Sequence, residues 1–325
     1  MAVPYSRMFF GLVPWYSFLI VLGAALAIFL AVREEKRSDL PKDTVIDLAL
    51  WLLPAGILGA RLYYVVFSWD QFHDDPVSAL YIWEGGIAIF GAVIAGFLVV
   101  VLFCRRRRLP ILRVCDVLVP GLVLAQAIGR WGNYFNMEAY GEPITNPAFQ
   151  FFPLGVLISD SGKPVWHMAT FFYESVWDFA VFLILLASRR RCRAVSGITF
   201  FMYLFLYSAG RLVIEDFRMD SLYASGSLRA SQLLSLLLCA AVLVLFLIRL
   251  RRTSGGCPPW LSALLVPDGL FAVAVLLYCV RLPALCFSAI SARLAFLGGF
   301  SALSLLVFFL LYRLLINAEV PDAHD

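Results

Sequence analysis

The sequence predicts an all-α integral membrane protein that crosses the bilayer several times. Of its 325 residues 62% are apolar and only 15% are charged, and the apolar residues are gathered in long runs. Ordinary soluble domains are about half apolar and about a quarter charged, and a helix needs about 20 apolar residues to span a bilayer. This composition therefore excludes a soluble globular enzyme.

The apolar runs are long enough to form about nine membrane spans. They lie at 11–32, 43–67, 86–104, 114–135, 171–188, 197–217, 231–249, 261–281 and 291–315. We expect the first seven to form the core, residues 1–252. A break rich in glycine and proline follows, so residues 253–325 are predicted to be a linker and an appended helical hairpin. Because few polar residues interrupt its two runs, we expect the hairpin to pack against the core without touching the reaction.

The basic residues predict the orientation of the chain. Lysines and arginines collect in 33–42, 105–113, 189–193 and 249–252, whereas the alternate loops carry almost none. Basic short loops stay in the cytoplasm, so we expect the N-terminus outside and the C-terminus in the cytoplasm. The longest outer stretch, about 137–169, is rich in glycine, proline, asparagine and aromatic residues and is predicted to form a small external cap.

Charge and cysteine usage exclude further classes. The net charge of +4 is too small to indicate a nucleic-acid surface. No C-x-x-C pair occurs among the seven cysteines, and the three histidines are scattered. We therefore expect neither a disulfide framework nor a metal site.

Polar residues gather at the predicted outer ends of several spans. Such residues are costly inside a membrane and are functional candidates by default. Arg211, Glu215 and Arg218 lie on one helix face by their spacing, as do Arg130 and Asn133. Guanidinium groups can grip two phosphate oxygens at once, so the cluster suits an anionic phosphodiester headgroup. The alternative is that these side chains only pair with one another to hold helices together, and for Glu174 we favour a structural role.

Residues 129–141, the signature segment Gly-Arg-Trp-Gly-Asn-Tyr-Phe-Asn-Met-Glu-Ala-Tyr-Gly, resemble the signature of the prolipoprotein diacylglyceryl transferases. The similarity extends in the same order over roughly residues 10–250. It includes Trp15-Tyr16, Gly59-Ala60-Arg61, Trp83-Glu84-Gly85-Gly86, Thr170 through Ser175, and Arg218 through Tyr223. One long motif with five ordered supporting blocks is a specific pattern.

The resemblance implies a transferase of the bacterial cytoplasmic (inner) membrane that carries out the first step of lipoprotein maturation. Such an enzyme moves the diacylglyceryl group from phosphatidylglycerol to the lipobox cysteine of a preprolipoprotein and releases glycerol phosphate. The implied partners are phosphatidylglycerol, the lipobox segment and membrane lipids, with no nucleic acid. This chemistry requires no metal or soluble cofactor.

The resemblance also implies which residues act. Arg130 would bind the phospholipid, and Arg211 would be needed for transfer, because positive charge stabilises a departing phosphate. The expected catalytic residues are Arg130, Arg211 and Glu215. The expected substrate-binding residues are Arg130, Asn133, Asn136, Glu138, Gly141, Tyr16, Arg61, Glu84 and Arg218.

The sequence departs from the family at Phe90, where a histidine is usual, and in the tail beyond about residue 253. A histidine-based mechanism therefore does not carry over, and the identity of the general base stays open. Two alternatives also remain. One is a lipid-headgroup-binding relative without catalysis, for which Phe90 is the only support. The other is a lipid transporter, which would need a polar path across the whole membrane rather than polar groups at one side.

Overall fold

The computed structural model describes residues 8–160, 163–221, 223–225, 228–254, 258–280 and 289–319. Within these residues, nine helices are long and apolar enough to cross a membrane, which confirms the predicted all-α polytopic fold. The chain forms two compact units, one of Ala27–Leu118 and one of Met1–Leu26 with Val119–Asp325. Helices α1 (Trp15–Glu35) and α4 (Ile111–Asn136) each give one part to either unit.

The Ala27–Leu118 unit is built on a tightly packed pair of helices, α2 (Thr44–Phe67) and α3 (Ile89–Arg107). A Cβ atom at Gly59 would lie 2.7 Å from the carbonyl oxygen of Gly91. Small residues at such a crossing let two membrane helices approach closely. The connection holds three short 3₁₀ helices, η1 (Trp69–Gln71), η2 (Pro76–Leu80) and η3 (Ile82–Glu84).

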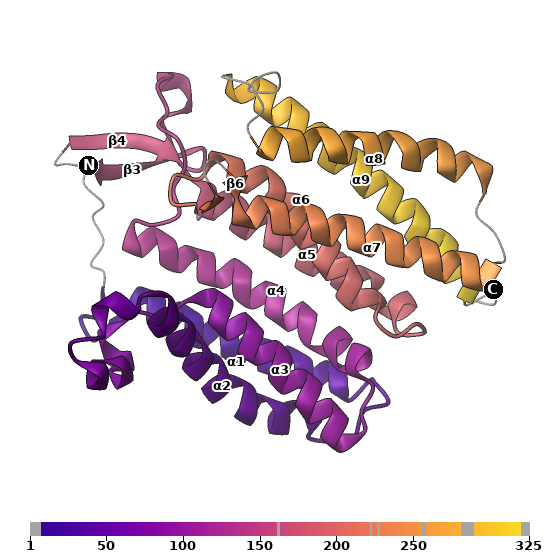
Figure 1. Cartoon of the computed structure of the whole chain (residues 1–325), viewed down its shortest axis with the longest axis horizontal. Helices are drawn as coiled ribbons and strands as arrows, with labels where there is room; N and C mark the ends of the chain where they lie inside the picture. The colour runs from indigo at the N-terminus through magenta and orange to yellow at the C-terminus, as the bar shows by residue number, and fades with distance from the viewer. Residues whose placement is uncertain are drawn as a thin grey trace. The chain divides into compact units, whose positions relative to one another are not determined.

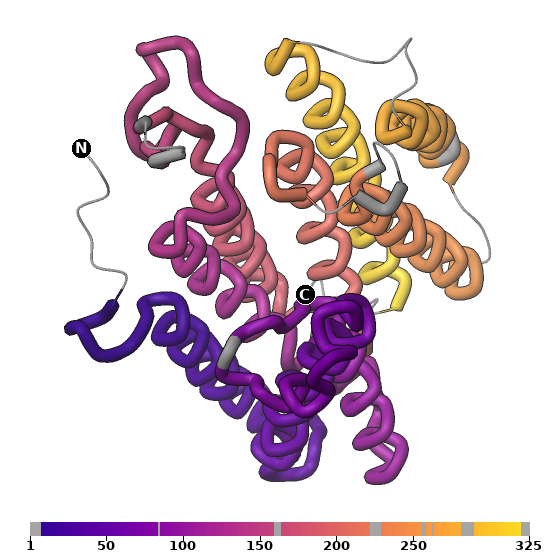
Figure 2. Tube along the Cα trace, turned by 60° about the vertical axis from the view of Figure 1, so that its left-hand side comes forward, coloured from indigo at the N-terminus to yellow at the C-terminus, as the bar shows by residue number. Residues whose placement is uncertain are grey.

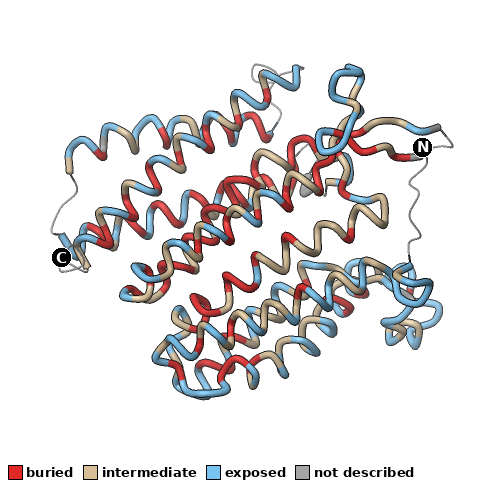
Figure 3. The backbone as a smooth tube through the Cα atoms, turned by 180° about the vertical axis from the view of Figure 1, so that it is seen from behind, coloured by how far each residue is buried: buried red, intermediate tan, exposed pale blue. Residues whose placement is uncertain are grey.

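The larger unit contains α5 (Thr170–Cys192), α6 (Ile198–Phe217) and α7 (Ala230–Ser254), which lie side by side (Figure 1). Among the membrane-length helices of the described chain, α6 has the largest buried share. Figure 3 shows the buried positions gathered on the central helices of this unit. The first part of α1 packs on the last part of α4, where the rings of Trp15 and Phe135 stack with centroids 4.8 Å apart.

Residues 137–169 contain a hairpin of β3 (Gly155–Asp160) and β4 (Lys163–Met168), preceded by η4 (Pro147–Phe149). A small buried cluster anchors this hairpin to the start of α5; it consists of Ala139, Val156, Ile158, Ala169 and Phe171. Two shorter antiparallel pairs complete the described strands: β1 (Met8–Phe9) with β2 (Val13–Pro14), and β5 (Tyr223–Ser225) with β6 (Leu228–Arg229).

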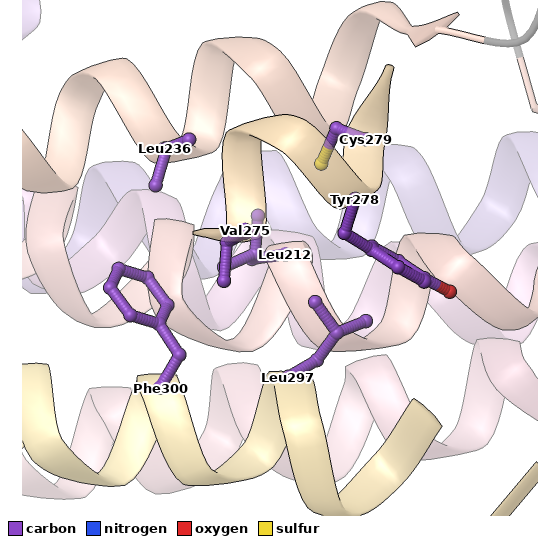
Figure 4. Close-up of a cluster of buried hydrophobic side chains, with 7 residues drawn as sticks. All are labelled: Leu212, Leu236, Val275, Tyr278, Cys279, Leu297 and Phe300. Atoms are coloured by element: carbon purple, nitrogen blue, oxygen red, sulfur yellow. The ribbon is translucent and has the colours of Figure 1, made fainter. Parts of the chain in front are cut away.

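The tail helices α8 (Pro259–Cys279) and α9 (Ile290–Glu319) belong to the larger unit. Helix α9 contacts α6 and α7, while α8 lies on its outer side (Figure 2). One buried cluster joins four helices (Figure 4); it consists of Leu212, Leu236, Val275, Tyr278, Cys279, Leu297 and Phe300. The tail is therefore packed into the same body as α5 to α7, and a functional boundary after residue 252 stays a prediction.

Candidate functional site

The polar cluster lies where α4 ends, α5 begins and α6 ends. The segment that follows α4 joins these three helix ends through backbone hydrogen bonds. Gly141 N donates to Met168 O at 2.8 Å, and Glu142 N donates to Phe217 O at 3.1 Å. The side chains at the three helix ends are thereby held close together.

Glu174, in the first turns of α5, is shared by three arginines. Its carboxylate lies 2.5 Å from Nη2 of Arg130 and 2.8 Å from Nη1 of Arg211, and Nη1 of Arg218 is 3.7 Å away. The Glu174 side chain is only 2% exposed. The sequence placed Arg130 on one helix face and Arg211 with Arg218 on another. The second placement is wrong for Arg218, because α6 ends at Phe217 and Arg218 has extended backbone. The structure brings all three arginines together on one buried carboxylate.

Two further carboxylates of the cluster each pair with one arginine. Nη2 of Arg211 lies 2.7 Å from Oε2 of Glu215, which confirms that these two residues share a helix face. Arg218 donates from Nε and Nη2 to the two oxygens of Asp220, at 2.9 and 2.8 Å. Partial burial alone would raise the pKa of Asp220, but the hydrogen bonds and charge of Arg218 outweigh it and lower that pKa. Asp220 is therefore an anion at neutral pH.

Arg130 is the arginine of this cluster with the most unused hydrogen-bonding capacity. Within the described chain its guanidinium contacts only Glu174, through one nitrogen, and its side chain is 21% exposed. The Arg211 and Arg218 side chains are 13% and 11% exposed, and two or three of their nitrogens contact carboxylates. A guanidinium has five N–H donors in a planar fork, so Arg130 has N–H donors left over that could bind a second anion.

Three further residues expected from the signature segment follow Arg130 in the last turns of α4 or just after its end. Asn133 and Asn136 are partly buried and Glu138 is exposed, and none of the three side chains forms a hydrogen bond with a described residue. Tyr16 packs on the same turn of α4, because a Cβ atom at Gly132 would lie 2.6 Å from Cδ2 of its ring. These polar groups are thus available to a ligand held by Arg130.

Gly141 lets the segment after α4 pass close to the end of α6 and the start of α5. A Cβ atom at this position would lie 2.8 Å from both the carbonyl oxygen of Phe217 and Cγ2 of Thr170. Two residues before it, Ala139 has φ 54°, and Met137 has φ 57°. Residues other than glycine rarely occupy this left-handed region, and such strain is often found at functional sites. The segment is therefore shaped to hold its side chains around the helix ends.

Arg61 belongs to the Ala27–Leu118 unit and is occupied by backbone carbonyls. It donates to the carbonyl oxygens of Ser78, Ala79, Gly85 and Gly86 at 2.6 to 3.0 Å, and it is 8% exposed. Four of its five N–H donors are thereby used to hold the loop between α2 and α3. The side chain of Glu84, another expected site residue, lies outside the described part of the chain.

Phe90 lies in the first turn of α3, with its ring centroid 6.3 Å from that of Tyr63.

Two acidic residues of the arginine cluster were absent from the expected site. Asp220 pairs with Arg218, and Asp178, one turn after Glu174, is fully buried with no hydrogen-bond partner for either oxygen among the described residues. The four-residue spacing from Glu174 is the sequence signal that could have identified Asp178.

Membrane-length helices of this number define a multi-pass membrane protein, and the arginines gathered at the ends of three of them are a candidate anion-binding site. The family model described as prolipoprotein diacylglyceryl transferase matches residues 8–248. The chain therefore belongs to the prolipoprotein diacylglyceryl transferase family, which confirms the resemblance seen in the sequence and makes the protein a transferase.

Individual relatives agree with this assignment. The phosphatidylglycerol–prolipoprotein diacylglyceryl transferase of Enterococcus faecalis is 43% identical over 247 residues, which cover 75% of this chain and 89% of the relative. Those of Halalkalibacterium halodurans and Shouchella clausii are 41% and 40% identical over 252 residues, covering 76% of this chain and 87% and 91% of the relatives. The matched family region ends before α8 and α9.

Proposed function

We propose that this protein transfers the diacylglyceryl group of phosphatidylglycerol to the lipobox cysteine thiol of a preprolipoprotein and releases glycerol phosphate. The observation that carries the proposal is the gathering of Arg130, Arg211 and Arg218 on Glu174 within the family region. The names of the relatives, which include both phosphatidylglycerol and prolipoprotein, support the same substrates.

Arg130 is the residue that grips the donor phosphate. It has unused N–H donors and the largest exposed fraction among the three arginines, and a guanidinium can hold two phosphate oxygens in parallel. We expect the amides of Asn133 and Asn136 and the hydroxyl of Tyr16 to bind the rest of the headgroup. Arg61 has a positioning role, since its donors already hold the loop between α2 and α3.

The reaction makes one bond and breaks one. The cysteine sulfur bonds to the primary carbon of the diacylglyceryl group, and the bond from that carbon to the phosphate oxygen breaks. Its electron pair leaves with glycerol phosphate, and the thiol proton passes to Glu215 or to the phosphate itself. Arg211 and Arg130 stabilise the negative charge that grows on the leaving phosphate. No metal or soluble cofactor enters this scheme.

Thiol activation here depends on charge. A free thiol has a pKa of about 8.5, so a few per cent is thiolate near neutral pH. Positive charges close to the sulfur increase that fraction, and Arg130 and Arg211 are held together by Glu174. The arginines could therefore supply the reactive thiolate without a histidine base, in a chain that has Phe90 where the family usually has histidine.

We place the site at the outer side of the membrane, with the N-terminus outside and the C-terminus in the cytoplasm. Helix α5 supports this orientation because it begins beside the arginine cluster and ends with Arg189, Arg190 and Arg191. Basic residues favour the cytoplasmic side. Phosphatidylglycerol, the lipobox segment and the surrounding lipids would meet the protein at the opposite end.

The test is thioether formation by purified protein in phosphatidylglycerol liposomes with a lipobox peptide. We expect a diacylglyceryl thioether on the peptide cysteine and an equal amount of glycerol phosphate. Binding of phosphatidylglycerol without any thioether would instead favour the non-catalytic lipid-binding alternative. Movement of phosphatidylglycerol between leaflets without thioether would favour the transporter.

A further inference from the structure

An arginine of the tail reaches the polar end of the core. In α9, Nη1 of Arg293 lies 2.8 Å from Oε1 of Glu142 and 3.3 Å from Oδ2 of Asp216, and Nη2 lies 2.5 Å from Oε2 of Glu142. The Arg293 side chain is 8% exposed. Arg293 therefore contacts two carboxylates that adjoin the arginine cluster, while the expectation that the hairpin packs without touching the reaction stays a prediction.

Helix α8 also contributes to this contact. The hydroxyl of Tyr278 donates to Oδ2 of Asp216 at 2.9 Å, and Asp216 is fully buried. The buried cluster of Figure 4 holds Tyr278 beside α6 and α9. The tail thus supplies both a positive charge and a hydroxyl donor to one buried carboxylate.

The two carboxylates held by Arg293 adjoin the arginine cluster. Glu142 follows Gly141, the last residue of the signature segment, and its backbone bonds to Phe217 and Met168. Asp216 lies between Glu215 and Phe217 at the end of α6. Arg293 therefore bridges the segment after α4 to the helix that carries Arg211 and Glu215.

We propose that Arg293 is a positioning residue for the transferase site, supplied by a tail that lies beyond the matched family region. This inference rests on the proposed function. Without the guanidinium, the carboxylates of Glu142 and Asp216 lose the positive charge that lies between them. The end of α6 then separates from the segment after α4, and Arg211 and Glu215 lose their alignment with a phosphate bound at Arg130.

The chain contains a matched control at the other end of α9. Arg249 of α7 donates from Nε and Nη2 to the two oxygens of Glu319, at 2.5 and 2.8 Å. This pair also ties α9 to its neighbours, but at the opposite end of the helix from Arg293. Removing the Arg249 pair tests whether activity depends only on attachment of the tail to the core. Removing the Arg293 contacts tests whether activity depends on the alignment of the end of α6 with the segment after α4.

The experiment compares Arg293→Gln, Arg293→Lys and Arg249→Gln in phosphatidylglycerol liposomes, with melting temperature, kcat and half-saturating phosphatidylglycerol measured for each. We expect kcat of Arg293→Gln to fall by about tenfold to a hundredfold, because small misplacements of reacting groups have effects of that size. Half-saturating phosphatidylglycerol should stay near the wild-type value, since Arg130 lies on α4. Arg293→Lys should recover part of kcat, and Arg249→Gln should keep it.

Several outcomes overturn the proposal. Wild-type kcat in folded Arg293→Gln, or equal losses of kcat in Arg293→Gln and Arg249→Gln, would mean that the tail only packs. If Arg293→Gln does not fold, Glu142→Gln replaces it, because that side chain is 32% exposed and its loss keeps Arg293 paired with Asp216. Its kcat should also fall, and an unchanged value overturns the proposal. Absence of thioether from the wild type overturns this inference together with the proposed function, whereas wild-type product with unchanged variants overturns the inference alone.

Discussion

Oε1 of Glu174 lies 2.5 Å from Nη2 of Arg130, so a carboxylate of the protein already contacts the guanidinium proposed to hold the donor phosphate. Glu174 also contacts Arg211 and Arg218. Its negative charge keeps the three arginines together against their mutual repulsion. Glu215 and Asp220 pair with Arg211 and Arg218, so Arg130 is the arginine that keeps the most donors for an incoming phosphodiester. Glu174 therefore holds the three arginines of the proposed anion site together, and the structural role favoured by the sequence stays a prediction.

Arg130→Lys tests the phosphate fork. Lysine keeps the positive charge but loses the planar pair of N–H groups, so it cannot hold two phosphate oxygens in parallel. We expect thioether formation to fall by about a hundredfold or more, as when one preorganised donor to a developing anion is removed. The measurement is the rate in phosphatidylglycerol liposomes, with circular dichroism to check folding. Wild-type turnover in a folded variant would exclude this role.

Glu174→Gln tests the shared carboxylate. The side chain is 2% exposed, and removal of one partner from a buried ion pair costs about 3 to 5 kcal/mol. We expect a loss of that order in the free energy of unfolding, measured by denaturation in detergent micelles. A loss below about 1 kcal/mol would mean that the arginines do not depend on Glu174.

Asp220→Asn is the matched control, because Asp220 pairs with Arg218 but is 46% exposed. We expect a loss of about 1 kcal/mol or less at neutral pH. Arg218 lowers the pKa of Asp220 in the folded state, so this stabilisation is present above the unfolded value of about 3.9. It is lost as the pH falls through the lower folded value. The difference between wild type and Asp220→Asn should therefore stay constant from pH 8 to about pH 5 and vanish in stronger acid.

The spans were predictable because each one is a local property of the chain. The apolar run 43–67 corresponds to α2 at Thr44–Phe67, and 197–217 corresponds to α6 at Ile198–Phe217. A membrane helix must satisfy its backbone internally over a fixed thickness, so length and hydropathy nearly determine it. The strands of the 137–169 stretch were not predicted, because short hairpins depend on the surface on which they pack.

The contacts within the site were only partly predictable. The pair of Arg211 and Glu215 follows from helix periodicity. The contact of Arg130 with Glu174 requires the packing of α4 against α5, which one sequence does not reveal. Arg293 was missed for the same reason, since its partner Glu142 is 151 positions away and a single arginine near the start of an apolar run is an ordinary interfacial residue.

Arg61→Lys tests whether Arg61 positions the loop between α2 and α3 rather than binding the donor lipid. Lysine cannot reach the four carbonyl oxygens of residues 78–86 that Arg61 holds. A hydrogen bond to a charged group contributes about 1.5 to 3 kcal/mol, so we expect loop 68–88 to be cleaved faster by proteases when these bonds are lost. Half-saturating phosphatidylglycerol should change much less than in Arg130→Lys. A large rise in that value with normal protease resistance would show instead that Arg61 contacts the donor.

Phe90→Ala tests whether the reaction needs a dedicated base at the start of α3. If positive charge activates the substrate thiol, Phe90→Ala keeps most of its activity, whereas Arg130→Ala and Arg211→Ala lose it. The wild-type rate should rise with pH toward the thiol value of about 8.5 rather than level near the histidine value of about 6.5. Asp220 does not contribute to that rise, because its lowered pKa keeps it ionised throughout the range.

The deciding comparison for Phe90 is Phe90→His in the same liposomes. Under electrostatic activation, an added imidazole changes the rate little at pH 8, because enough thiolate is already present beside Arg130 and Arg211. A profile of the wild type that levels near pH 6.5 would show that another group of that pKa removes the proton. Thioether from Phe90→His but none from the wild type would mean that the natural chain binds the lipid headgroup and has lost the transfer step.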